Sequence, residues 1–214
     1  EDIAALTAGQ LRGVTAAGLT ALSQQQLAAL SATQMSALGT SQLRGLTVAD
    51  IGALSETQLG ALSGSQIGGL TPAQVRGFSA TQVSSLTRTQ VAGFTALQLG
   101  SLTVTQVRSL TPEQIGGLSA AQVRGFSNTS VSALSVTQFE ALSSQRIGSF
   151  LATQVRGMTA TQIATLDTTE FSVLGATLAI VLGATMAVGP LSPVPLASLG
   201  GAAIAAVIVY RLAT

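Results

Sequence analysis

The sequence predicts an all-α solenoid of very short, self-capped helices, followed by an apolar helical hairpin. The first observation behind this fold class is an eight-residue word that recurs without a gap between Leu6 and Leu174, in twenty-one copies. The second is that each word contains a helix-capping pair and two apolar positions. The third is a charged fraction of only 8%, where about a quarter is usual for a globular protein. Gapless repeats of this kind stack as identical units along one axis.

The word has the order apolar, Thr/Ser, any, small, Gln, apolar, any, small. Thr or Ser fills position two in 18 of the 21 words, and Gln fills position five in 16. This spacing is that of a capping box, in which the hydroxyl accepts from the third helical N–H and the Gln accepts from the cap N–H. Pro72 and Pro112 fall on the first helical residue, where a missing N–H costs nothing. Positions one and six match a hydrophobic staple, so each word predicts one short helix.

Two other folds compete with this interpretation. One continuous α-helix is rejected, because an eight-residue period spreads the apolar positions around its surface. A β-solenoid with a turn inside every word remains the alternative. In a β-solenoid, pairs such as Thr87 and Thr89 would form a flat hydroxyl array facing ice or a polysaccharide, and the glutamines would form an amide ladder. We favour the capping role, because it explains the Thr/Ser positions as well.

Position seven differs between alternate words and suggests a sixteen-residue period. Six of the nine arginines occupy one set of words and none the other. Phe78, Phe94 and Phe126 at position one share a phase, with Phe150 the exception. We therefore expect two helices per coil and ten coils, roughly 80–100 Å long at ordinary helix spacing. The arginines would then form one row that keeps an edge soluble or contacts carboxylates or carbonyls of a neighbouring subunit: Arg12, Arg44, Arg76, Arg108, Arg124 and Arg156.

The composition changes near Leu174, which divides the chain into a repeat solenoid at 1–170 and an apolar segment at 171–214. Two uncharged apolar runs in that segment flank a proline-rich turn, and the first is long enough to span a bilayer. We expect the segment either to bury against another subunit or to form a membrane hairpin. The residues expected to make these contacts are Phe171, Leu174, Leu178, Leu182, Ile204, Val207 and Tyr210.

Several function classes are disfavoured by what the chain lacks. Without Cys, His or Lys, the usual metal ligands, general bases and activated nucleophiles are missing. The eight acidic residues are scattered among different words, which disfavours a catalytic carboxylate pair. A net charge of +1 argues against an electrostatic nucleic-acid binder. We therefore expect no catalytic site, no cofactor, no metal and no nucleic-acid partner.

Words such as LSATQM, LTPEQI and LTRTQV resemble the octapeptide arrays of large bacterial surface and secreted proteins of adhesin-like type. The resemblance implies an extracellular or cell-surface structural role. The leading hypothesis is a subunit that self-assembles into a filament. The alternatives are a membrane-anchored adhesin stalk and an ice- or polysaccharide-binding β-solenoid. Glu1 falls inside a word, so we expect either cleavage from a precursor or further repeats upstream.

Overall fold

The computed structural model describes residues 3–175 and contains only helices and the turns between them over that range. A short 3₁₀ turn, η1, is followed by twenty α-helices of four to six residues, each in its own octad, and then by helical residues 168–175. Their bounds are η1 Ile3–Ala5, α1 Ala8–Arg12, α2 Ala16–Thr20, α3 Gln24–Ala28, α4 Ala32–Ala37, α5 Thr40–Leu43, α6 Val48–Ala53, α7 Glu56–Gly60, α8 Gly64–Gly69, α9 Pro72–Arg76, α10 Ala80–Ser85, α11 Arg88–Ala92, α12 Ala96–Ser101, α13 Val104–Ser109, α14 Pro112–Ile115, α15 Ala120–Val123, α16 Asn128–Ala133, α17 Val136–Glu140, α18 Ser144–Ile147, α19 Ala152–Arg156 and α20 Ala160–Ala164. The all-helical prediction is confirmed for these residues, and the β-solenoid alternative is not supported.

Fifteen of the twenty α-helices start at a complete capping box, and the exceptions are α2, α5, α16, α18 and α19. In α11, the Thr87 hydroxyl accepts from the Gln90 N–H at 3.2 Å, and the Thr87 N–H donates to Gln90 Oε1 at 2.9 Å. Gly39 and Leu151 lack a hydroxyl, yet their N–H groups still donate to the glutamine three residues later, at 2.8 and 2.9 Å. In the pair Thr87 and Thr89, which a β-solenoid would use for a binding array, the Thr87 hydroxyl is therefore engaged in helix capping.

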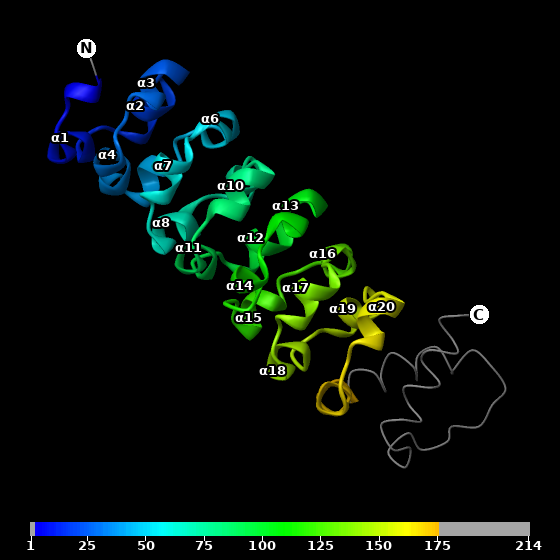
Figure 1. Ribbon diagram of the computed structural model, residues 1–214. Coiled ribbons are helices and arrows are strands. Elements are labelled where there is room, and N and C mark those ends of the chain that lie inside the picture. Colours follow the sequence, from blue (N-terminus) through cyan, green and yellow to red (C-terminus); the bar gives the residue numbers. More distant parts are fainter. Residues whose placement is uncertain (1–2, 176–214) are drawn as a thin grey trace.

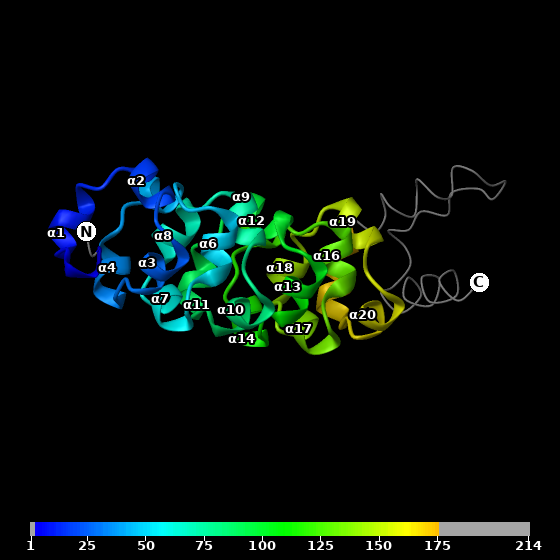
Figure 2. The same ribbon diagram turned by 90° about the horizontal axis from the view of Figure 1, so that it is seen from above.

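The helices stack in columns of every third helix. Contacts join α1 to α4, α2 to α5 and α3 to α6, and this pattern continues to α17 with α20. Three columns result: column A (α1, α4, α7, α10, α13, α16, α19), column B (α2, α5, α8, α11, α14, α17, α20) and column C (α3, α6, α9, α12, α15, α18). Figures 1 and 2 show the resulting rod, with its amino end at one tip of the stack.

The prediction of two octads per coil is therefore wrong: one coil contains three octads, or 24 residues. Twenty-one octads make seven such coils instead of ten, which at ordinary helix spacing gives a rod about 55–70 Å long. The expected grouping of the phenylalanine residues is corrected in the same way. Phe78, Phe126 and Phe150 each lead into a helix of column A, whereas Phe94 leads into column C, so the expected sixteen-residue phase has no counterpart in space.

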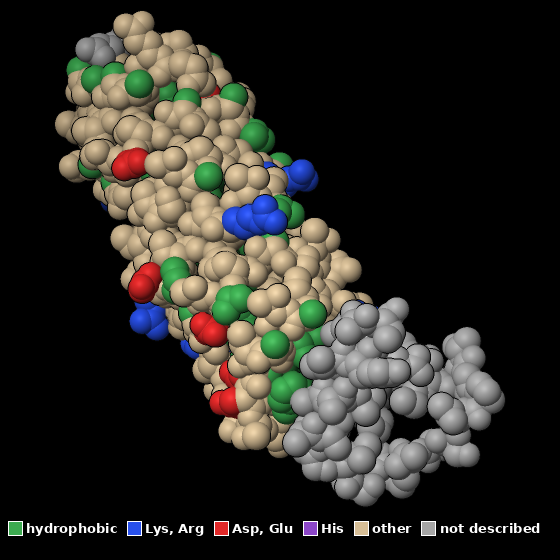
Figure 3. Space-filling model, turned by 45° about the vertical axis from the view of Figure 1, so that its right-hand side comes forward, with side chains coloured by type: hydrophobic (Ala, Val, Ile, Leu, Met, Phe, Trp, Pro, Cys, Tyr) green, Lys and Arg blue, Asp and Glu red, His purple; other side chains and the backbone are tan. Residues whose placement is uncertain are grey.

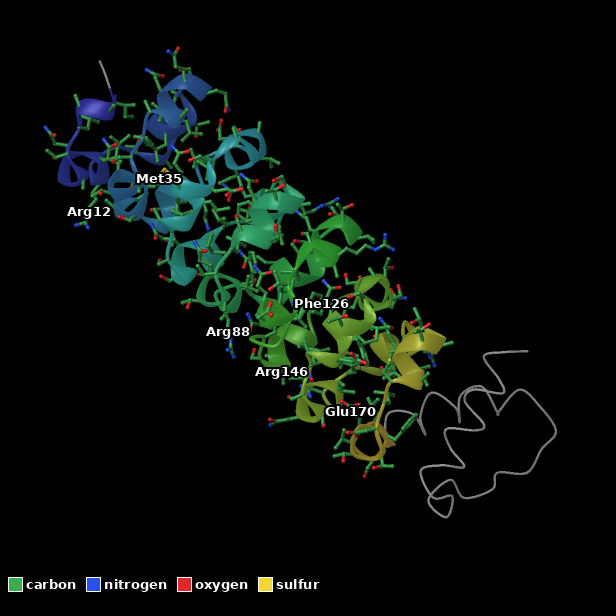
Figure 4. The ribbon with its side chains drawn as sticks, viewed as in Figure 1. Arg12, Met35, Arg88, Phe126, Arg146 and Glu170 are labelled. Carbon is green, nitrogen blue, oxygen red and sulfur yellow. The ribbon has the colours of Figure 1, made fainter. Side chains whose placement is uncertain are left out.

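The core is built from positions one and six of the octads, which line the inside of the coil. Position-six residues such as Leu43, Ile67 and Val91 are fully buried. Position-one residues such as Leu62 and Phe78 are nearly so, with 2% and 3% exposed. Figure 4 shows Met35 and Phe126 lying between helices while Arg88 points away from the rod. Because each octad contributes only two core side chains, a coil is stable only when its neighbours cover it.

Position eight is small for a reason that the sequence did not indicate. No residue described by the structure has a positive φ, so a left-handed turn is not what requires a small side chain here. Instead, the backbones of successive coils approach closely there. A Cβ on Gly93 would lie 2.1 Å from the carbonyl oxygen of Gly64, and one on Gly125 would lie 2.2 Å from that of Ala96. The glycines thus permit close stacking of one coil on the next.

The described chain ends at residue 175, two residues beyond the last octad, 166–173. Residues 168–175 are helical, Leu174 is fully buried and Phe171 packs half-buried against the core. Residues 171–175 therefore continue the solenoid. The other residues of the predicted assembly or membrane segment lie outside the described residues: Leu178, Leu182, Ile204, Val207 and Tyr210. Among residues 3–175, no helix has the length and hydropathy needed to cross a bilayer.

Candidate functional site

The glutamine at position five has two hydrogen-bonding ends, and both are used. In Gln90, Oε1 accepts from the cap N–H of its own helix, while Nε2 donates to the carbonyls of Leu59 and Leu62, each at 2.8 Å. These two carbonyls lie 31 and 28 residues earlier, where α7 ends and the chain turns into α8. One buried amide therefore caps its own helix and also binds the preceding coil.

This contact recurs along the rod. Fourteen of the sixteen glutamines at position five donate through Nε2 to the position-one carbonyl 28 residues earlier, at 2.6–2.9 Å. The last carbonyls of a helix have no partner within that helix. A glutamine side chain can bond both to the cap N–H and to these carbonyls, because it carries an acceptor oxygen and two N–H donors. We call these bonds the inter-coil glutamine contacts.

Beyond the first coil, four octads replace the glutamine at position five, with Asp50, Ser130, Arg146 and Glu170. Arg146 donates through Nε to the Leu118 carbonyl, the equivalent acceptor. Asp50 accepts from the Thr47 N–H at 2.8 Å and from Gln24 Nε2 at 2.5 Å, so here the donor comes from the preceding coil. Ser130 bonds only within its own octad. No buried side-chain nitrogen or oxygen in the described part of the chain lacks a partner.

The two remaining glutamines, Gln10 and Gln26, belong to the first coil. Their Oε1 atoms accept from the cap N–H groups of Thr7 and Ser23, at 2.8 and 2.9 Å. Both side chains are exposed, and their Nε2 atoms donate to no described residue. The hydrogen bond that caps the helix is therefore present in both, whereas neither makes a hydrogen bond to another described coil.

Apolar side chains beside these amides are also less covered than elsewhere. The position-one residues of the first coil, Leu6, Val14 and Leu22, are half-buried, whereas their equivalents from Leu30 to Leu166 are buried. The difference arises because the described sequence begins inside an octad, so that no described coil precedes these side chains and covers them.

The predicted arginine row does not form. Arg12, Arg108 and Arg156 lie in column A, Arg44 in column B, and Arg76 and Arg124 in column C. The row depended on a sixteen-residue coil, and a 24-residue coil distributes the same residues over all three columns.

Two of these arginines contact carbonyls of the same chain. Arg44 Nε donates to the Gly69 carbonyl at 2.6 Å, and Arg124 Nε donates to the Ser149 carbonyl at 2.9 Å, in each case across to the next coil. At some glycines of position seven, such as Gly68 and Gly100, a Cβ would collide with a carbonyl of the next coil, whereas a Cβ on Gly60 would meet no atom within 4 Å. At these positions the residue at position seven thus takes part in the stacking of coils, either through an arginine side chain or through a close backbone approach.

Charged groups are sparse and separated on the face shown in Figure 3. Among residues 3–175, no group of three or more acidic or other metal-ligating side chains comes together. The pKa of Glu113 lies below its ordinary value, because a backbone N–H at the start of α14 and the Thr111 hydroxyl donate to the carboxylate. This is a helix-capping environment. The chemistry available at the candidate site is the pairing of amides with carbonyls and the burial of apolar surface.

The comparisons with known proteins agree with the repeat architecture. No curated protein is significantly similar to the chain. Residues 35–72, which contain four complete octads, are similar to the ALTTAQ repeat.

Proposed function

We propose that this protein is a non-enzymatic structural subunit that self-associates into a filament, outside the bacterial cell or on its surface. The resemblance of its octads to those of surface and secreted proteins supports the location. The absence of Cys, His and Lys from the whole sequence supports a role without catalysis.

The observation that carries the proposal is that the coil-on-coil contact is the same contact repeated along the rod. In all fourteen inter-coil glutamine contacts, the glutamine donates to a carbonyl of the coil before it. Such a contact is heterologous, because the two sides of each coil are different surfaces. Heterologous contacts that do not close into a ring generate open filaments. A solenoid of this kind can therefore be extended by further coils of the same type.

Sedimentation velocity and negative-stain electron microscopy on the purified full-length chain test the proposal. Raising the protein concentration should produce unbranched fibres, and their mean length should increase with concentration. A chain that stays monomeric at high concentration in detergent-free buffer would contradict the proposal. Antibody labelling of intact and permeabilised cells tests the location separately, and labelling only after permeabilisation would exclude a surface filament.

A further inference from the structure

We infer that the outer face of column C binds the same face of a second copy of this chain, in antiparallel orientation. This contact lies along the side of the rod and involves neither end of the stack. It goes beyond the proposed function and does not depend on it. Its basis is the pattern of side chains at position four, which differs between the three columns.

Position four points away from the axis of the rod. On an α-helix it lies about 200° around from position six, which is buried in the core. In column C every position-four residue is exposed, and because successive helices of the column contact one another, these residues follow each other at one per coil. We call them the outer row of column C: Gln25, Ala49, Ala73, Leu97, Ala121 and Gln145.

The outer row of column C is apolar in its middle, polar at both ends and free of charge. Leu97 is 72% exposed, and Val48, beside the row at position three, is 46% exposed. The equivalent residues of the other columns are mostly polar: column A has threonine in six successive coils from Thr33 to Thr153, and column B has five hydroxyl side chains, Ala17 and Glu113. Since position four is exposed in all three columns, core packing does not explain the apolar row.

The row is complementary to itself when a second copy is turned end over end. With the two-fold axis between α9 and α12, Leu97 faces Ala73 of the second copy, Ala49 faces Ala121, and Gln25 faces Gln145. The one large side chain then meets a small one. Each terminal amide meets another amide, and such groups pair because each carries both donors and an acceptor. A contact of this kind, with the same patch on both partners, closes into a symmetric dimer.

Parallel arrangements fit less well. In register, Leu97 would meet Leu97 and Arg76 would meet Arg76, so that both bulk and like charge coincide. A shift by one coil would place the Gln145 amide against Ala121, where it finds no hydrogen-bonding partner. In the antiparallel pair, Arg76 on α9 faces α12 and Arg124 on α15 faces α6, so the arginines of the two copies do not meet.

The size of the face sets the expected strength of the contact. Six helices at a spacing of about 8–10 Å, each about 10 Å wide, give a total buried area on the order of 1,000 Å². This is the lower limit for a specific interface. We therefore expect a weak, reversible dimer that sedimentation velocity detects in a concentration series of the full-length chain.

The test is the double variant Ala73→Glu/Leu97→Glu. In the antiparallel pair, the two introduced carboxylates of one copy face those of the other. We expect the dissociation constant of the dimer to rise by about tenfold or more, because like charges facing each other across an interface are strongly unfavourable. A mixture with Ala73→Lys/Leu97→Lys should restore dimers, since opposite charges then face each other.

The matched control is Thr81→Glu/Thr105→Glu. It adds the same charge at two exposed position-four residues in successive coils of column A. The control should dimerise as the wild type does, and circular dichroism melting verifies that all variants are folded. A wild type without dimers, or equal dissociation constants for the double variant and the control, would overturn the inference.

Disulfide crosslinking tests the orientation, because the chain has no cysteine of its own. Under mild oxidation, Ala49→Cys mixed with Ala121→Cys should give a crosslinked dimer. Ala49→Cys alone should give little, since its two copies lie three coils apart in the antiparallel pair. Efficient crosslinking of Ala49→Cys alone would refute the antiparallel pair. Dimers without fibres would support this inference and refute the proposed filament, whereas fibres one rod wide, without the mixed crosslink, would do the reverse.

Discussion

Gln98 Nε2 donates to the carbonyl of Leu70 at 2.8 Å, although 28 residues separate them in the chain. The Gln98 side chain is only 1% exposed, and its Oε1 accepts from the cap N–H of Thr95 at 2.7 Å. One side chain thus couples a local feature, the start of a helix, to the packing of successive coils.

The first prediction concerns the replacement of a buried inter-coil amide by a carboxylate. Gln98→Glu should keep the cap at Thr95 but bury a carboxylate against the Leu70 and Ile67 carbonyls. We expect a loss of about 3 kcal/mol in unfolding free energy, since the acceptors lose their donor and the charge has no partner. Gln10→Glu, made in the exposed first coil, is the control and should cost little. Urea denaturation of both variants measures the difference, and similar midpoints would contradict the role assigned to Nε2.

The second prediction concerns the close approach of coils at glycine. Gly93→Ala would place its Cβ 2.1 Å from the Gly64 carbonyl oxygen, so the coils must separate. We expect a cost of about 1–3 kcal/mol, the usual range for overpacking. Gly60→Ala is the control, because a Cβ there meets no atom within 4 Å and the residue is helical. That variant should be more stable by about 0.5–1 kcal/mol. Thermal melts of the two variants should move in opposite directions, and a shared direction would disprove the steric explanation.

The third prediction separates contacts within the chain from contacts between subunits. Arg44→Gln removes the bond from Nε to the Gly69 carbonyl and should lower the unfolding free energy by about 0.5–1 kcal/mol, a small value because the pair is exposed. Arg12 is at the same position of its octad, but the structure shows no such bond for it. Arg12→Gln should therefore change the unfolding free energy by less. Denaturation and sedimentation measurements on both variants decide the matter. If Arg44→Gln leaves stability unchanged and reduces filament formation, the arginine acts between subunits instead.

The fourth prediction concerns pH. Since hydrogen bonds lower the pKa of Glu113 in the folded chain, this carboxylate stabilises the fold above its unfolded pKa. The contribution is lost as the pH falls through the lower folded value. An NMR titration of the Glu113 side chain should give a midpoint below the ordinary glutamate value. Glu113→Gln should remove the corresponding part of the pH dependence of stability, and a midpoint at or above the ordinary value would contradict the bonding described.

The local fold could be predicted from the sequence because its determinants are contiguous. Thr71, Pro72 and Gln74 specify a helix start within four residues, and the structure has that start. The same holds at the other capping boxes, whose bonds join residues three apart. Local agreement of this kind, repeated at fifteen of the twenty α-helices, made the helices and their all-α stacking predictable.

The number of octads per coil was not predictable in the same way, because it depends on contacts between residues 24 to 31 positions apart. Arginines at position seven follow a sixteen-residue pattern in the sequence, yet Arg12 and Arg44 lie in different columns. Their pattern therefore does not report the coil period. The capping-box spacing accounts only for the acceptor oxygen of the glutamine, whereas its Nε2 donor binds a carbonyl 28 residues away. A signal was present: sixteen glutamines and a single Glu at position five favour a side chain that donates as well as accepts.

The distance between spin labels on neighbouring coils tests the three-octad coil most directly. The chain has no cysteine, so labels can be attached at pairs of introduced cysteines without interference. Thr57, Ala73 and Thr81 are exposed at position four of their octads. Labels at Thr57 and Thr81, 24 residues apart in adjacent helices of column A, should show strong dipolar broadening in electron paramagnetic resonance, as expected for a helix spacing of about 8–10 Å. Labels at Thr57 and Ala73, which lie in different columns, should show weaker broadening. The opposite order would establish a sixteen-residue coil and contradict the account of the glutamine contacts.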